Sequence, residues 1–96
     1  QSVQRDFSFI VDQNIEASIL VNAAKGADKS LIKDAYIFDQ FINLSENAPK
    51  MQGKKSLAIA VHIQSSEKTL IDDEIENVSK KVIASIEKAS GGVLRS

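Results

Sequence analysis

Large aliphatic residues alternate with small or polar residues from position 55 to position 63. The odd positions hold Leu57, Ile59, Val61 and Ile63. The even positions hold Ser56, Ala58, Ala60 and His62. Because a strand directs alternate side chains to opposite faces, this pattern predicts a strand with one face in a core. The small residues of the other face are typical of a surface on which a ligand docks.

The remaining patterns predict three more strands and two helices. Strand-like alternation covers residues 5–11, 31–42 and 93–95, and a loop is expected at 43–53. Apolar residues at helical spacing predict helices from Ala17 to Ala27 and from Asp72 to Ser90. Gly26 or the residues after it should end the first helix, and Gly91 with Gly92 the second. For the start of the second helix, Thr69 and Asp72 resemble a capping box, although Asp72 alone is an alternative cap.

The order strand, helix, strand, strand, helix, strand predicts an α+β, ferredoxin-like βαββαβ sandwich. Right-handed crossovers should place both helices on one face of an antiparallel sheet and leave the other face open. The residues expected under the helices are Phe7, Phe9, Tyr36, Phe38, Leu57, Ile59 and Val61. The residues expected on the open face are Ser8, Ile10, Ile37, Asp39, Phe41, Ser56, Ala58, Ala60 and His62.

Composition limits the function classes. A chain of 96 residues with 43% hydrophobic residues fits one domain, without cysteine for disulfides and with one histidine. No apolar run approaches the roughly 20 residues that span a bilayer. A net charge of −1 argues against a general nucleic-acid binder, and neither DNA nor a membrane is an expected partner. Residues 47–66 nevertheless contain lysines and no acid, and a start at Gln1 suggests a processed chain or an excised fragment.

Asp39 and Phe41 form the sharpest candidate pair, since residues two apart on a strand share a face. An aromatic ring stacks an unpaired base, and a carboxylate accepts two neighbouring donors such as those of guanine. Ser8 and Ser56 add hydroxyl groups on adjoining strands. This combination suits single-stranded RNA. The alternative is a solvated Asp39 and a core Phe41, and spacing alone favours that second interpretation.

Other candidates carry weaker signals. Lys54 and Lys55 after Gly53 are candidate phosphate contacts, or simply a solvated turn. His62 has no catalytic partner near it in sequence. The acids from Asp72 to Glu76 lack the spacing of a calcium loop and suit a helix N-terminus. The chain contains no nucleophile elbow, Walker motif or metal-ligand cluster, so its residues indicate a binding module without catalytic activity.

Several ordered fragments resemble one known family, the ferredoxin-fold anticodon-binding domain that closes the β subunit of bacterial phenylalanyl-tRNA synthetase. The fragments are 5–9, 38–41, 53–58, 69–75 and 94–95, and the resemblance extends from about Val3 to Arg95. The chain departs from the family pattern at Phe41, where tyrosine is common, at Ser8, where alanine also occurs, and at Ile71, where threonine is usual.

The resemblance implies that the chain is a single domain, 1–96, cut from the C-terminus of a much longer cytoplasmic protein. It implies contacts from Ser8, Asp39, Phe41 and Ser56 to the first anticodon base, a guanine, of phenylalanine tRNA. The parent would be phenylalanine–tRNA ligase, an α2β2 heterotetramer that uses ATP and Mg²⁺ in protein synthesis. This chain would need no cofactor and no metal.

Two other functions stay open at this point. One is a ferredoxin-like regulatory or protein-interaction module that uses the open sheet face for a partner strand or a small ligand. The other is an acylphosphatase-like hydrolase of the same fold. That hydrolase needs a phosphate-cradling loop, and residues 12–17 offer no glycine-rich cradle.

Overall fold

A computed structural model of the chain describes residues 3–41, 53–65 and 69–95. Within these residues the elements follow the predicted order. They are β1 (Val3–Asp12), α1 (Ala17–Ala27), β2 (Ile32–Phe41), β3 (Lys54–Ile63), α2 (Asp72–Ser90) and β4 (Val93–Arg95). The loop expected at 43–53 lies outside the described residues except for Gly53.

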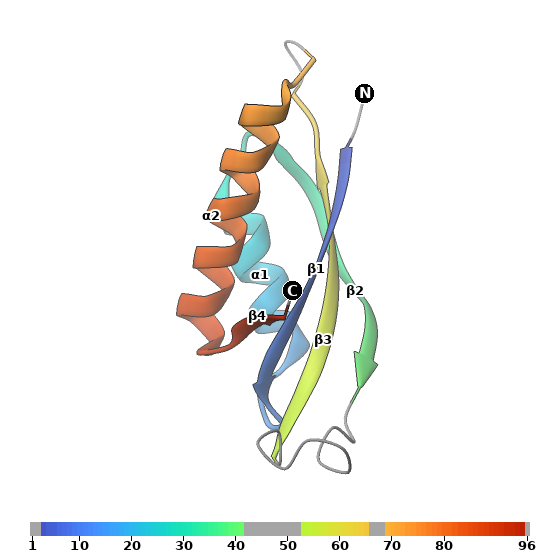
Figure 1. Cartoon of the computed structure of the whole chain (residues 1–96), viewed down its shortest axis with the longest axis vertical. Coiled ribbons are helices and arrows are strands. Elements are labelled where there is room, and N and C mark those ends of the chain that lie inside the picture. Colours follow the sequence, from blue (N-terminus) through green and yellow to red (C-terminus); the bar gives the residue numbers. More distant parts are fainter. Residues whose placement is uncertain (1–2, 42–52, 66–68, 96) are drawn as a thin grey trace.

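The four strands form one antiparallel sheet in the order β2-β3-β1-β4. Both helices lie on the same side of this sheet, and the other face is uncovered by any helix (Figure 1). The crossovers β1-α1-β2 and β3-α2-β4 each connect parallel strands with one strand between them, which is the geometry that a right-handed crossover produces. The predicted α+β, ferredoxin-like fold is confirmed.

The hydrophobic core lies between the sheet and the two helices. The odd positions of β3, which the alternation assigned to the core, are fully buried. The core cluster consists of Phe9, Val11, Leu20, Ala24, Ile32, Ala35, Leu57, Ile59, Val61, Ile63, Ile75, Val78, Val82 and Ile86. The apolar stripe of α2 therefore faces the sheet as its spacing predicted.

The faces predicted for the first part of β2 are wrong. Tyr36 and Phe38, expected under the helices, are 42% and 51% exposed. Ala35 and Ile37 occupy the core side instead, opposite Val61 and Ile59. The physical reason is that β2 departs twice from regular pairing with β3, between residues 32 and 34 and between 37 and 39, and each extra residue reverses the alternation.

The ends of the two helices agree in part with the ends predicted from the sequence. Gly91 ends α2 in the left-handed conformation, with φ of 72°, as predicted. The predicted N-cap at Thr69 or Asp72 is wrong, because Ile71 holds that position and the Glu74 carboxylate accepts a hydrogen bond from its N–H at 3.1 Å. Gly26 lies inside α1, which ends at Ala27.

Asp28, the residue after α1, links this helix to α2 and to the turn before β2. Its Oδ1 accepts hydrogen bonds from the Ser30 hydroxyl at 2.8 Å and the Leu31 N–H at 3.2 Å. The Lys81 ammonium of α2 lies 3.5 Å from Oδ2. Partial burial works to raise the pKa of Asp28, but the hydrogen bonds and the Lys81 charge outweigh it and hold the pKa below 3.8.

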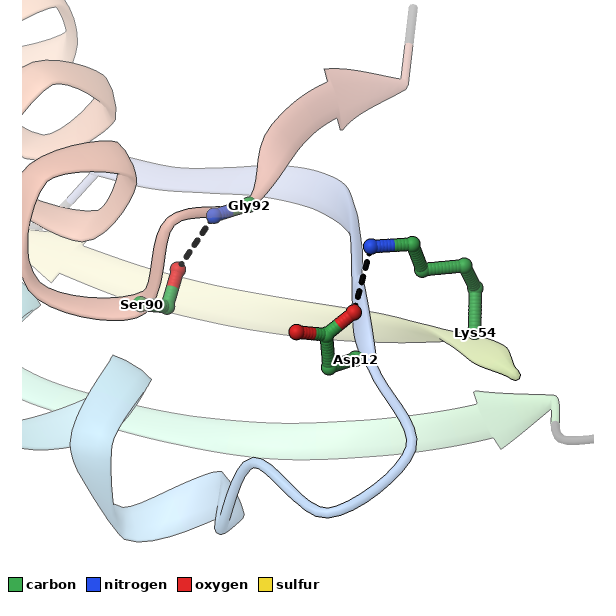
Figure 2. A network of polar contacts seen from close by, with 4 residues as sticks. All are labelled: Asp12, Lys54, Ser90 and Gly92. Carbon is green, nitrogen blue, oxygen red and sulfur yellow. Dashed lines mark hydrogen bonds and ion pairs between the residues drawn. The ribbon is translucent and has the colours of Figure 1, made fainter.

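Gly92 brings β4 against β1. A Cβ at this position would lie 2.5 Å from Val11 Cγ1 and 2.9 Å from the Ile10 carbonyl oxygen. The Gly92 N–H donates to the Ser90 hydroxyl at 3.0 Å (Figure 2). The absence of a side chain therefore lets the chain leave α2 and pair with β1 within three residues.

Candidate nucleic-acid interface

Strand pairing aligns four of the predicted site positions in two rows across the open face. Ser8 of β1 and Asp39 of β2 both pair with Ala58 of β3, so these side chains form one row. In the next row, Ser56 lies between Ile10 and Phe41. The predicted positions Ser8, Asp39, Phe41 and Ser56 therefore come from three strands and lie within two adjacent rows, although 48 positions of sequence separate Ser8 from Ser56.

Asp39 is exposed, and its carboxylate has a defined orientation. The Gln40 N–H donates to its Oδ1 at 2.8 Å. This local bond engages Oδ1, and a carboxylate has further acceptor sites with which it can bind a ligand. Asp34, on the same strand and the same face, repeats the arrangement, because the Ala35 N–H donates to its Oδ1 at 2.9 Å.

Phe41 and Ser56 are the two predicted residues of the second row. Phe41 pairs through its backbone with Ser56, and its side chain lies outside the described part of the structure. Ser56 is only 2% exposed, so little of its hydroxyl is open to a ligand. Ser8 is half-buried. The central strand of the open face therefore carries only small side chains at positions 56, 58 and 60, between β1 and β2.

The two predicted lysines lie on opposite faces of the sheet. Lys54 is on the open face and forms an ion pair with Asp12, the residue that it opposes in β1 (Figure 2). Lys55 lies on the helix-covered face opposite Val11 and is 9% exposed. Lys55 thus does not share a face with the other predicted residues, and its phosphate contact stays a prediction that the geometry does not favour.

The sequence interpretation missed Tyr36 as a residue of the open face. Tyr36 pairs with Ala60, one row beyond Asp39, and its ring centroid lies 5.8 Å from that of His62 with a 35° tilt. Among the described residues, the His62 Nε2 is a buried polar atom without a hydrogen-bond partner. Nothing in the strand alternation pointed to Tyr36, because the shift in pairing that turns it outward leaves no mark in the hydrophobic pattern.

Charge is unevenly distributed on the open face. At its paired positions in the described strands, the cations are Lys54 and Arg95, which lie toward the end where β1 turns into α1. The carboxylates at such positions are Asp6, Asp12, Asp34 and Asp39. Because Asp12 already pairs with Lys54, Arg95 is the more favourable of these two cations for contact with a polyanion.

Residues 3–41, 53–65 and 69–95 contain no group of three histidine or acidic side chains placed to hold a metal ion. The two helices in the same residues are too short or too polar to cross a bilayer.

Comparison with known proteins agrees with this geometry. Residues 1–95 match the model of the ferredoxin-fold anticodon binding domain. The chain is 50% identical over 95 residues to the phenylalanine–tRNA ligase β subunit of Cereibacter sphaeroides. The aligned residues make up 99% of the chain and 12% of that subunit. The identity to the corresponding subunits of Ruegeria pomeroyi and Bradyrhizobium diazoefficiens is 53% and 50%, over 99% of the chain and 11% of each subunit.

The chain thus spans only 11–12% of the length of these curated relatives. The family match, in contrast, extends over nearly every residue and agrees with the βαββαβ order and the open sheet face. On these grounds the chain belongs to the ferredoxin-fold anticodon binding domain family.

Proposed function

We propose that this chain is the C-terminal anticodon-binding domain of a phenylalanine–tRNA ligase β subunit and that its open sheet face binds the anticodon loop of phenylalanine tRNA. The observation that carries the proposal is the row of Ser8, Ala58 and Asp39 across three strands, with the exposed Asp39 carboxylate at its end. The similarity to three β subunits supports the parent protein.

Asp39 would read the first anticodon base. A guanine presents its N1–H and N2–H donors side by side, and a carboxylate accepts both. The bond from Gln40 N–H to Oδ1 restricts rotation of the carboxylate before the base arrives, which lowers the entropy lost on binding. The ring of Phe41 would stack on the base, since its backbone lies in the adjacent row. The small Ala58 and the half-buried Ser8 let the base approach the sheet.

The rest of the parent would supply the chemistry. We propose that this domain catalyses nothing itself and that ATP and Mg²⁺ act elsewhere in the ligase, because the sequence carries no phosphate-binding glycine loop and no nucleophile motif. The expected assembly is an α2β2 heterotetramer in the cytoplasm, where the domain holds the anticodon loop while the acceptor end reaches the α subunit.

The test compares Asp39→Asn with Asp34→Asn in the full-length ligase. Both carboxylates lie on β2 and the open face, and each accepts its neighbour's N–H, so the two substitutions are matched. The measurement is the affinity for anticodon stem-loops that carry guanine or adenine at the first anticodon position. Asp39→Asn should lose about 1–3 kcal/mol of guanine preference, the value of one bidentate base contact.

Asp34→Asn should keep the preference of the wild type. Equal guanine preference in wild type and both variants would mean that Asp39 does not read the base. Binding of the stem-loop no tighter than that of the same stem closed by an unrelated loop would contradict the proposed function as a whole.

A further inference from the structure

A groove on the open face lies between β1 and β4, at the edge of the sheet opposite to β2 and Asp39. It encloses about 410 Å³. Its lining consists of Ile10, Lys54, Gly91, Val93, Leu94 and Arg95. We propose that this groove is a second nucleotide subsite, which holds the base of a neighbouring loop nucleotide on Ile10 and Val93 and its phosphate on Arg95; this inference rests on the proposed function.

The floor of the groove suits a flat apolar group. Val93 pairs with Ile10, so the two aliphatic side chains lie next to each other on the open face. Val93 is 63% exposed, so its side chain is accessible to a ligand in the groove. The close contact of Gly92 with β1 fixes the position of Val93, because it brings the chain against Ile10 directly before the strand. The volume falls within the usual range of small-ligand sites.

The charges at the groove suit an anion attached to that flat group. Its lining contains two cations and no carboxylate. Lys54 is already paired with Asp12, whereas Arg95 has no ion-pair partner among the described residues. A guanidinium binds phosphate through two parallel N–H groups, and pairing it with a polyanion is favourable where no carboxylate competes. An apolar floor beside an arginine that has no ion-pair partner within residues 3–41, 53–65 and 69–95 suits a nucleotide better than an uncharged ligand.

The position of the groove connects it to the proposed base-reading residues. Arg95 pairs with Ser8, so Arg95, Ser8, Ala58 and Asp39 form one row over all four strands. With strands about 4.8 Å apart, the row places Arg95 about 14 Å from Asp39. A few nucleotides of a single-stranded loop cover such a distance, so one loop can occupy both ends of the row. This continuity favours RNA over a separate protein partner.

The experiment measures how binding of the full-length ligase to the anticodon stem-loop depends on salt, for Arg95→Gln and Arg5→Gln. Arg5 is a matched control, because it is also exposed and lies on β1 at a position that faces the helix side. Loss of one phosphate contact should lower the slope of log K against log salt concentration by about 0.7. Arg95→Gln should show this change with an affinity loss of about five- to tenfold at low salt, and Arg95→Lys should restore most of the slope.

A second variant tests the apolar floor. Val93→Ser should weaken binding about fivefold, since it removes apolar contact, and its high exposure makes a loss of folding unexpected. The effect should vanish when one loop nucleotide flanking the first anticodon position is replaced by an abasic one. That loss of effect identifies the base that occupies the groove.

The outcomes separate this inference from the proposed function. If Asp39→Asn loses guanine preference while Arg95→Gln and Arg5→Gln share the wild-type slope, the anticodon function stands and the second subsite is wrong. If the stem-loop binds no better than an unrelated loop, both proposals are wrong. If Arg95→Gln and Val93→Ser change subunit assembly at unchanged RNA affinity, a protein segment occupies the groove and the RNA subsite is overturned.

Discussion

Asp39 lies opposite Ala58, whereas Ile37, only two residues earlier, lies opposite Ile59. In regular pairing, residues two apart on one strand face residues two apart on the other. Here β3 advances by one residue while β2 advances by two, so Phe38 is an extra residue. Ile37 therefore points into the core and Asp39 points to the open face, although an unbroken strand would put them on the same side.

This shift in pairing predicts an unusual tolerance to deletion. Removal of Phe38 should join Ile37 to Asp39 in regular register and keep Asp39 opposite Ala58 on the open face. Removal of Gln40 should instead move Phe41 into the place opposite Leu57, on the helix side. In stem-loop binding by the full-length ligase, the Phe38 deletion should keep the guanine preference, and the Gln40 deletion should weaken binding through loss of stacking. The reverse ranking would show that the assigned register is wrong.

Tyr36 should contribute a second stacking surface, one row from Asp39. Tyr36 is 42% exposed, and its ring centroid lies 5.8 Å from that of His62, so the ring has a neighbour to pack against in the absence of RNA. Tyr36→Ala should weaken stem-loop binding by about 1–3 kcal/mol, the usual value of base–aromatic stacking. Tyr36→Phe keeps the ring and should bind like wild type. A loss in Tyr36→Phe as large as in Tyr36→Ala would point to the hydroxyl and contradict a stacking role.

Gly92→Ala should destabilise the fold, because the new Cβ would clash with Val11 and with the backbone of Ile10. The expected cost is about 1–3 kcal/mol in the free energy of unfolding, as for other overpacked sites. Denaturant unfolding of the chain measures it. The matched control is Gly26→Ala in α1, where no atom lies within 4 Å of the added Cβ.

Gly26→Ala should stabilise by up to about 1 kcal/mol, because alanine has the higher helix propensity. If both alanine variants were equally stable, the close approach of β4 to β1 would not need a glycine.

Asp28→Asn should destabilise the chain in a pH-dependent way. The pKa of Asp28 is held below 3.8 in the folded state, so its charged form stabilises the fold above that value and the contribution is lost as pH falls through the folded pKa. The variant should cost about 1 kcal/mol at neutral pH, the net value of a typical hydrogen bond, and should approach wild type in acid. Unfolding at a series of pH values between neutral and acid measures this difference.

Lysine variants on α2 give the control for this prediction. Lys81→Gln removes one cause of the lowered pKa of Asp28. It should therefore reduce the change in the free energy of unfolding between neutral and acid pH. Lys80→Gln removes the neighbouring charge, which lies 3.9 Å from Glu76 in an exposed ion pair. This variant should leave the pH dependence of stability unchanged. Equal effects of the two variants would argue against a specific Lys81–Asp28 interaction.

Most of the fold could be predicted from local patterns. The alternation in β3 identified its buried face, since a strand that packs a helix layer must place its large residues on that side. The apolar residues at helical spacing in α2 predicted the helix, and Gly91 predicted where it ends. The N-cap was not predicted, because Ile71 has no polar side chain to cap the helix. The Glu74 carboxylate, one turn later, instead accepts a hydrogen bond from the Ile71 backbone N–H.

Local patterns predicted the residues of the candidate site less completely than they predicted the fold. The pairing of Ser8, Ala58 and Asp39 confirms the open-face positions expected from residue spacing. Tyr36 and the groove beside Arg95 were missed, because they depend on which residues of distant strands lie opposite one another. Lys55 was grouped with Lys54, and only the strand pairing separates the two onto different faces.

The sequence by itself determined the order of elements, the core face of β3 and the motifs of the family, because these depend on residues that are near one another in the chain. The tertiary structure alone decided the register. Pairing is set by the packing of all four strands against both helices, and a single extra residue such as Phe38 reverses every side chain beyond it. Asp39, Tyr36 and Arg95 therefore share one face because of how three strands pair with their neighbours, and the residues of one strand alone do not determine that pairing.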